Sequence, residues 1–154
     1  DRPAVLFVCL GNICRSPLAE AAFRAEAGRA GLAVTVDSAG TAGWHHGRPP
    51  DARARAVARR HGVDIDGYRA RQVVADDFRR FDHIVALDRD NLATLTALRP
   101  AGATARLSLL LDHVAGREGE AVADPYYGPE AGFEVTWAEV SEAARGLVRA
   151  IRAG

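Results

Sequence analysis

Short apolar runs alternate with amphipathic stretches along this chain. Four runs have the length and the β-branched or aromatic content of buried strands, at residues 4–8, 32–36, 81–87 and 106–111. Apolar residues at helical spacing predict helices at residues 17–28 (ending between Gly28 and Gly31), 50–61, 88–98 and 133–153. We expect residues 63–77 and 113–132 to be irregular.

Strands that alternate with helices predict a single α/β domain over residues 1–154, with a parallel sheet and helices on both of its faces. Right-handed crossovers place ligands beyond the C-terminal ends of such strands, where the strand order reverses. Cys9 ends the first strand and Asp88 follows the third. Both side chains are therefore expected at the same edge of the sheet.

Residues 9–15 join the first strand to the first helix, which Ser16 can cap and whose first turn suits Pro17. In such a junction the backbone N–H groups and the helix N-terminus face the same space, which makes an anion site. Gly11 lets the backbone curl closely, and Arg15 can donate to two oxygens of one anion. Phosphate is the anion that best matches these donors.

Cys9 lies at the mouth of this loop. Free cysteines are usually small buried hydrophobes, but helix N-termini and nearby cations favour the thiolate form. A thiolate beneath a bound phosphoryl group is a nucleophile in position, and the Ser16 hydroxyl can stabilise it. The joint presence of Cys9, Gly11, Arg15 and Ser16 at a strand-to-helix turn therefore favours a nucleophilic role for the cysteine.

The composition narrows the classes of function. The 154 residues carry a formal net charge of zero at pH 7, so there is no broad electrostatic case for binding nucleic acid or an anionic membrane. No apolar run is long enough to span a bilayer, and no signal-like start is present. All 20 basic residues are Arg, which excludes a Walker-type lysine site and Schiff-base chemistry. Abundant Ala, Arg and Gly indicate a bacterial source.

The cysteines and histidines suggest neither a disulfide framework nor a metal site. The two cysteines lie in one loop, which indicates a reducing compartment. We therefore expect a cytoplasmic protein, with export by a route without a signal peptide left open. Five histidines show no metal-ligand spacing, namely His45, His46, His61, His83 and His113. We expect no metal ion and no organic cofactor.

Two motifs carry a family resemblance. The pattern Cys-(x)5-Arg-Ser, filled by Leu-Gly-Asn-Ile-Cys and followed by Pro17, resembles the signature of the low-molecular-weight protein tyrosine phosphatases. Residues 124–128, Asp-Pro-Tyr-Tyr-Gly, are similar to the second motif of that family, and the resemblance runs from Val5 to about Val148. It implies a four-stranded sheet of order 2-1-3-4 and hydrolysis of phosphotyrosine through a cysteinyl-phosphate intermediate.

The resemblance also implies roles for individual residues. Cys9 is the nucleophile, and Asp124 is the general acid and then the base, although an Asp before a Pro is by itself usually a turn residue. The phosphate is bound by the Arg15 side chain and by the backbone of Leu10, Gly11, Asn12, Ile13, Cys14 and Arg15. Tyrosine-phosphorylated proteins are the expected substrates, inorganic phosphate and other oxyanions the expected inhibitors, and we expect a monomer.

Asn12 has two interpretations. An Asn in a turn tolerates the left-handed backbone; in the family it also stiffens the loop through hydrogen bonds with residues that match Ser16 and Ser38 and with a His. Tyr68 stands where the family often has that His, and its phenol can also form hydrogen bonds, with a different reach. Cys14 is either a small core residue or, as in relatives with the same pair, the partner in a protective disulfide with the nucleophile.

Three aromatic side chains are candidates for the walls of a substrate cleft, Trp44, Tyr126 and Tyr127. Aromatic walls suit a flat phenyl phosphate and give the depth that phosphotyrosine needs. Each of them could instead be an incidental core or surface aromatic, and the matching tyrosines are phosphorylated in some relatives.

Three rival functions fit the loop less well. Arsenate reductases share the fold and the loop but need further cysteines downstream, and none follows Cys14. Some relatives dephosphorylate phosphoarginine and carry Thr where this chain has Ile13, whose apolar side chain favours an aromatic ester. A phosphate-sensing module would keep the loop but lose the acid, and the presence of Asp124 argues against it.

Overall fold

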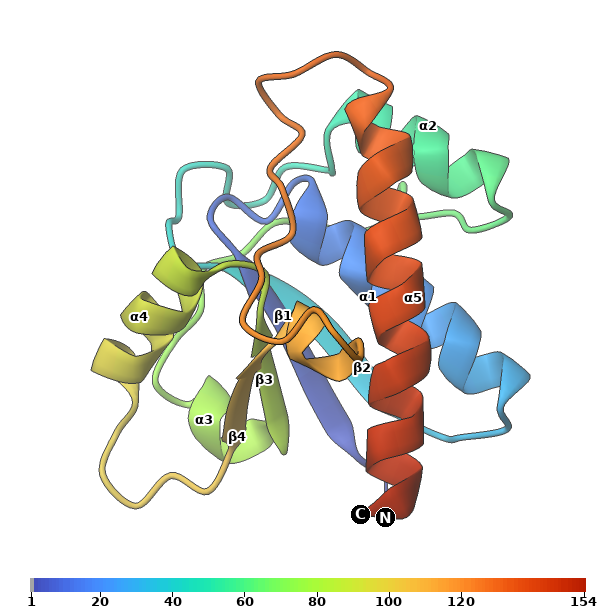
Figure 1. Cartoon of the computed structure of the whole chain (residues 1–154). Helices are drawn as coiled ribbons and strands as arrows, with labels where there is room; N and C mark the ends of the chain where they lie inside the picture. The colour runs from blue at the N-terminus through green and yellow to red at the C-terminus, as the bar shows by residue number, and fades with distance from the viewer. Residues whose placement is uncertain (1) are drawn as a thin grey trace.

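A parallel sheet of four strands forms the centre of the molecule, with helices on both faces (Figure 1). The computed structural model describes residues 2–154. The strands are β1 (Ala4–Cys9), β2 (Thr35–Gly40), β3 (His83–Ala86) and β4 (Arg106–Leu109). The helices are α1 (Arg15–Arg29), α2 (Ala52–Arg60), α3 (Asp77–Arg80), α4 (Arg89–Leu98), the 3-10 turn η1 (Leu110–His113) and α5 (Gly132–Ala153). The strand order is β2-β1-β3-β4, which confirms the expected topology.

The central strand β1 is buried on both faces because its alternate side chains enter two different cores. Val5 and Phe7 pack into the larger core with residues of α1 and α5. Leu6 and Val8 pack into the smaller core on the opposite face, where α3 and α4 contribute. A strand flanked by helices on both sides needs apolar residues at every position, and this explains the uninterrupted apolar run before Cys9.

The second strand was predicted too early, at residues 32–36, and the structure places it at Thr35–Gly40. Its register pairs Cys9 with Gly40, so the strand runs on beside the anion-binding loop. The apolar pattern on which the prediction depends is interrupted at Asp37 and Ser38. Both have polar partners in the structure: Asp37 pairs with Arg71, and Ser38 donates to Glu20.

Two other boundaries also differ from the prediction. The fourth strand ends at Leu109 rather than residue 111, and Leu110 and Leu111 are buried in the 3-10 turn that follows. The stretch 63–77 is not wholly irregular, because Gln72 forms a β-bridge with Gly40 and the short helix α3 begins at Asp77. An apolar run does not reveal where a chain leaves the plane of a sheet, and short elements carry little periodicity.

The second and third of the predicted helices, at residues 50–61 and 88–98, each begin after an Asp side chain that caps them. The Asp51 side chain accepts a hydrogen bond from the N–H of Arg53 at 2.8 Å, ahead of α2. The Asp88 side chain accepts one from the N–H of Asn91 at 2.7 Å, ahead of α4. Within residues 2–154, none of the helices has the length and apolar content that crossing a bilayer requires.

Candidate active site

The loop between β1 and α1 is curved, and its backbone N–H groups are left without partners in the part of the protein that the structure describes. Within residues 2–154, no protein group accepts a hydrogen bond from the N–H of any residue in the stretch 10–14. The carbonyls of the loop point the other way: those of Cys9 and Leu10 accept from the N–H groups of Thr41 and Ala42 at 2.9 and 3.0 Å. The loop therefore presents donors on one side only, as an anion site requires.

Asn12 holds the shape of this loop. Its φ of 59° makes it a non-glycine residue in the left-handed region, a conformation that Asn adopts more readily than most residues. Its Nδ2 donates to the hydroxyls of Ser16 and Ser38 at 2.7 and 3.0 Å. Its Oδ1 accepts from the backbone N–H of Arg71 at 3.0 Å. One side chain thus ties the loop to α1, to β2 and to the segment at residue 71.

Gly40 allows β2 to lie directly against the loop. A Cβ at this position would lie 2.7 Å from the carbonyl oxygen of Leu10 and 2.9 Å from that of Ala42. Real side chains do not tolerate such distances to backbone atoms. Only glycine therefore permits the close approach that fixes the outer wall of the loop.

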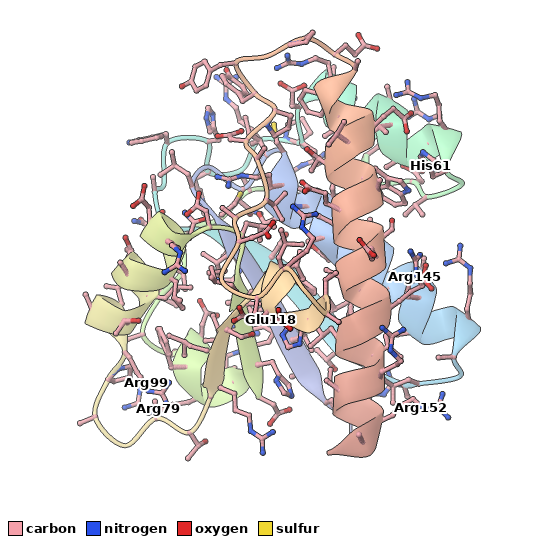
Figure 2. All side chains as sticks on the ribbon, in the orientation of Figure 1. His61, Arg79, Arg99, Glu118, Arg145 and Arg152 are labelled. Atoms are coloured by element: carbon pink, nitrogen blue, oxygen red, sulfur yellow. The ribbon has the colours of Figure 1, made fainter. Side chains whose placement is uncertain are left out.

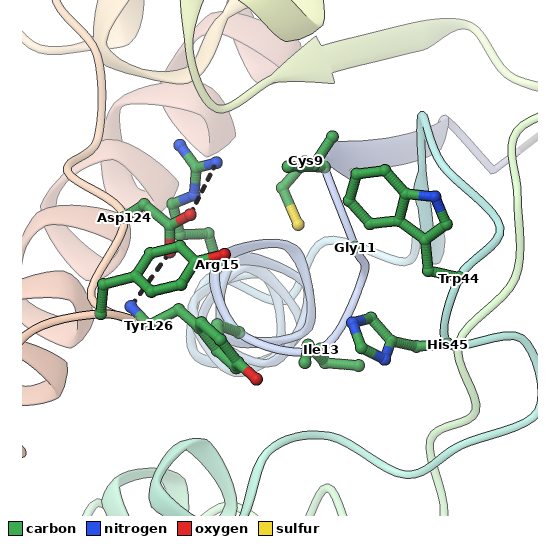
Figure 3. Close-up of a pocket in the computed structure, with 11 residues that line it drawn as sticks. Cys9, Gly11, Ile13, Arg15, Trp44, His45, Asp124 and Tyr126 are labelled. Atoms are coloured by element: carbon green, nitrogen blue, oxygen red, sulfur yellow. Dashed lines mark hydrogen bonds and ion pairs between the residues drawn. The ribbon is translucent and has the colours of Figure 1, made fainter.

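The Cys9 sulfur lies at the floor of a pocket and points toward its middle (Figure 3). It is 3.0 Å from the Ser16 hydroxyl oxygen. Because this hydroxyl accepts from Asn12 Nδ2, its own proton is available to the sulfur. The prediction that Ser16 caps the first helix was wrong: α1 begins at Arg15, so Ser16 is inside its first turn, and no side chain caps the helix. Its hydroxyl contacts the sulfur instead.

The Arg15 side chain is buried and directed across the pocket. Its Nη1 donates to Asp88 Oδ2 at 2.8 Å and to the carbonyl of Val122 at 3.0 Å. Its Nη2 lies 3.7 Å from Asp124 Oδ2. The guanidinium therefore connects the anion-binding loop with the segment that carries Asp124.

Asp88 has a role in this arrangement that the sequence did not reveal. Its Oδ1 caps α4 while its Oδ2 pairs with Arg15. The prediction placed Asp88 at this edge of the sheet but gave it no partner. A carboxylate has two oxygens, and an N-cap occupies only one of them, so a capping Asp at the edge of a binding site has a second acceptor free for a nearby cation.

Asp124 is at the opposite side of the pocket from Trp44 and His45 (Figure 3). Its Oδ1 accepts from the N–H of Tyr126 at 3.1 Å, which orients the carboxyl. Its side chain is about one third exposed, at 37 %. Asp124 thus lines the same pocket as Cys9 while remaining accessible to water.

The pocket has a volume of about 240 Å³. It is lined by Cys9, Leu10, Gly11, Ile13, Cys14, Arg15, Trp44, His45, Asp124, Tyr126 and Tyr127. The three aromatic residues proposed as cleft walls are all in this set, with Trp44 and Tyr127 72 % and 90 % exposed. His45, which the sequence did not single out, lies over Gly11: a Cβ there would be 3.0 Å from the imidazole Cδ2.

Arg53 supports the tyrosine side of the pocket and was also not foreseen. Its guanidinium lies 5.5 Å from the ring centre of Tyr126 and 4.6 Å from that of Phe133. It also donates to both carboxylate oxygens of Asp51 at 3.0 and 3.1 Å. The charge of Arg53 is thereby paired while its flat face packs on the rings.

A comparison with known families agrees with this geometry. A family model described as "Low molecular weight phosphotyrosine protein phosphatase" matches residues 4–154. The chain belongs to this family. A low molecular weight protein-tyrosine-phosphatase of Streptomyces coelicolor is 47% identical over 154 residues, which cover 96% of this chain and 93% of the relative. A low molecular weight phosphotyrosine protein phosphatase of Schizosaccharomyces pombe is 39% identical over 150 residues, or 96% of each chain.

Solved structures of low molecular weight phosphatases share the whole fold. A crystal structure of the protein tyrosine phosphatase from Entamoeba histolytica, with Hepes in its active site, superposes with a TM-score of 0.93. The two chains are 36% identical, and the match covers 99% of this chain and 98% of the other. The protein is therefore a phosphatase, a hydrolase, with the four-stranded parallel sheet of this family.

In the described part of the chain, Tyr68 of this phosphatase forms no hydrogen bond with Asn12. Its hydroxyl accepts from Arg24 Nε at 3.4 Å, and Arg24 pairs at 2.7 Å with the buried Glu20. Glu20 in turn accepts from the Ser38 hydroxyl at 2.7 Å. The chain of contacts from Tyr68 thus reaches the loop indirectly, through Arg24, Glu20 and Ser38. Burial raises the pKa of the Glu20 carboxyl.

Cys14 is a free, buried thiol in this phosphatase. Burial raises its pKa far above the usual range, and the negative charge of Asp51 adds to the effect. Cys14 therefore stays neutral at physiological pH. Within residues 2–154, no cluster of three or more His, Cys, Asp or Glu side chains is arranged to hold a metal ion.

Proposed function

We propose that this phosphatase hydrolyses phosphotyrosine in two steps, with Cys9 as nucleophile and Asp124 as general acid and base. One observation carries the proposal: the Cys9 sulfur, the Arg15 guanidinium and the Asp124 carboxyl line a single pocket whose floor consists of unpaired N–H groups. A nucleophile, a charge stabiliser and a proton donor around one anion site are the components that phosphoryl transfer requires.

In the first step the sulfur attacks phosphorus. The S–P bond forms, the bond between phosphorus and the phenolic oxygen breaks, and Asp124 gives its proton to the leaving phenolate. In the second step a water attacks phosphorus and the S–P bond breaks. Asp124 takes a proton from the water, and Cys9 leaves as a thiolate. Inorganic phosphate is the product, and Asp124 is protonated again for the next cycle.

Arg15 and the N–H groups of residues 10–15 stabilise the non-bridging oxygens in both transition states. These donors are held in place before substrate binds, by Asp88 and Val122 for the guanidinium and by Asn12 for the loop. Donors that need no reorganisation are the most effective ones for developing charge. The Ser16 hydroxyl, 3.0 Å from the sulfur, stabilises the thiolate as nucleophile and as leaving group.

The aromatic walls support tyrosine-phosphorylated proteins as substrates. Trp44, Tyr126 and Tyr127 provide flat surfaces around the sulfur, and Ile13 adds an apolar side chain at the floor. A phenyl ring buries its faces against such surfaces, whereas a serine side chain is too small to do so. Phosphate and vanadate would compete for the same donors. The site is complete within one chain, which supports a monomer, and two free cysteines suit the reducing cytoplasm.

Two substitutions test the mechanism with p-nitrophenyl phosphate and a phosphotyrosine peptide. Cys9→Ser abolishes turnover, because a hydroxyl is a far weaker nucleophile at neutral pH. Asp124→Ala lowers turnover by about 10²–10⁴-fold but preserves binding of inorganic phosphate, measured by calorimetry. Vanadate inhibits the unmodified protein, and EDTA does not. Full activity in either variant would refute the assignment.

A further inference from the structure

The mouth of the pocket is asymmetric in charge. On one side, the segment 124–130 has acidic and phenolic side chains, those of Asp124, Tyr126, Tyr127 and Glu130. On the other side, the segment 43–50 has two imidazoles and one guanidinium and contains no carboxylate. The charge pattern around the pocket therefore distinguishes one flank of a bound peptide from the other.

Arg48 is fixed close to the pocket by backbone hydrogen bonds. Its N–H donates at 2.9 Å to the carbonyl of His45, which lines the pocket. Its own carbonyl accepts from the N–H of Ala70 at 2.9 Å, and the carbonyl of Ala70 accepts from the N–H of Gly47 at 2.8 Å. Arg48 is thus one turn away from the pocket lining, on a segment that is held at both ends.

The charge of Arg48 is not neutralised by the protein. Its side chain is exposed, and in the described part of the chain it forms no ion pair. Arg53, also near the pocket, differs in this respect, because Asp51 pairs with it. Arg69, next to Ala70, is exposed as well, and within residues 2–154 its guanidinium donates only to the carbonyls of Asp66 and Tyr68.

We propose that these residues select phosphotyrosine segments in which Asp or Glu lies within three positions of the phosphotyrosine. We call Arg48 and Arg69 the cationic shoulder. The proposal rests on the phosphotyrosine activity proposed above and names the kind of segment that the site prefers. An extended peptide advances about 3.3 Å per residue, or about 10 Å over three residues, and a single turn of chain separates Arg48 from His45 in the pocket lining.

The expected preference for acidic peptides is small, because the charges of Arg48 and Arg69 are exposed to solvent. Exposed ion pairs are weak and are screened by salt, so one pair changes the rate by about fivefold at most. Such charges at the rim of an interface act mainly on association and on its salt dependence. The effect should therefore appear in kcat/KM and not in kcat.

The test compares phosphotyrosine peptides of equal length that have Glu or Lys at the three positions on one side of the phosphotyrosine and Ala on the other side, with each side tested in turn, so that the acidic segment 124–130 does not cancel the effect. Their kcat/KM values are measured for the unmodified chain and for Arg48→Glu, each normalised to the same protein's rate on p-nitrophenyl phosphate. Arg79→Glu is the matched control: it makes the same charge change at an exposed position in α3, away from the site (Figure 2). Arg69→Glu is a second variant of the shoulder.

On the side that faces Arg48, the unmodified chain is expected to prefer Glu over Lys by up to about fivefold, and the ratio should approach one at about 0.5 M NaCl. Arg48→Glu and Arg69→Glu should each lower the ratio at low salt, while Arg79→Glu should leave it unchanged. Equal rates on the Glu and Lys peptides for both sides, or equal effects of Arg48→Glu and Arg79→Glu, would overturn the proposal. An unmodified chain that hydrolyses neither peptide nor p-nitrophenyl phosphate would instead overturn the proposed function itself.

Discussion

Asp88 connects the anion-binding loop to α4, and its two oxygens allow its two tasks to be separated. Oδ1 caps the helix at the N–H of Asn91, and Oδ2 pairs with Arg15 at 2.8 Å. Asp88→Asn retains an oxygen for the cap but places an amide donor against the guanidinium. Asp88→Ala removes both the cap and the pair. The stability difference between Asp88→Asn and Asp88→Ala therefore measures the contribution of the helix cap. The effect of Asp88→Asn alone measures the contribution of the negative charge.

The magnitude follows from the burial of the pair. Two unit charges about 4 Å apart attract by about 4 kcal/mol at an effective dielectric constant of about 20. Arg15 is 5 % exposed at its side chain but Asp88 is 23 % exposed, so water screens part of this attraction. We expect Asp88→Asn to lower the free energy of unfolding by about 2–3 kcal/mol. Asp88→Ala should cost about 1 kcal/mol more, because the cap is lost as well.

Activity should fall more steeply than stability. Without Asp88 the guanidinium is held only by the carbonyl of Val122 and by the long contact to Asp124. Displacement of a catalytic group by about 1 Å can cost about 100-fold in rate, so we expect kcat on p-nitrophenyl phosphate to fall by about 10- to 100-fold. Urea denaturation and steady-state kinetics at pH 7 measure the two effects.

The neighbouring Asp90 provides the control. It lies in the first turn of α4 and is exposed, so Asp90→Asn makes the same charge change without contact to Arg15. This variant should turn over like the unmodified chain and lose only about 0.3–1 kcal/mol of stability, the usual contribution of an acidic side chain in the first turn of a helix. If Asp88→Asn behaved like Asp90→Asn in both assays, the argument that Asp88 positions Arg15 would be wrong.

Three further predictions follow. Gly28→Ala should raise the free energy of unfolding, measured in urea, by about 0.5–1 kcal/mol, because the new Cβ meets nothing within 4 Å. Gly146→Ala should lower this free energy by about 1–3 kcal/mol, because the new Cβ would overlap the carbonyl of His113. Two variants of equal stability would contradict this prediction. Asn12→Gly keeps the left-handed backbone but loses three hydrogen bonds, so it should fold yet turn over more slowly, and Asn12→Ala should also lose about 1–2 kcal/mol of stability. Burial lowers the pKa of His113 below 6.5, so the unfolded state binds more protons than the folded state as the pH falls. Stability should therefore decrease as the pH drops below about 6.5. His113→Gln should reduce this dependence of the melting temperature on pH.

The sequence predicted those parts of the molecule in which the pattern of neighbouring residues matches their burial and contacts in the fold. The apolar run before Cys9 is continuous because β1 is buried on both faces, and the loop after it carries its donors in consecutive residues. The strand β2 was misplaced because its polar residues, Asp37 and Ser38, have partners more than a dozen positions away in the sequence. Pattern analysis of a strand does not detect partners at that distance.

The same reason explains which site residues were missed. Asp88, Glu20 and His45 act through contacts with residues 18 to 73 positions away or through the fold of another loop. None of them belongs to a short motif with a recognisable spacing. Tyr68 was singled out because of a family pattern, and its actual contact with Arg24 depends on a side-chain direction that the pattern does not encode.

Cys9 lies at the end of the most deeply buried strand, and this position determines how the enzyme loses activity on heating. Residues 5–8 are entirely inaccessible to solvent, and their side chains alternate between the two cores. The strand that carries the sulfur therefore cannot unfold locally without disrupting both cores. Its amide protons should exchange only through global opening. Thermal inactivation and melting of the sheet are then a single cooperative event.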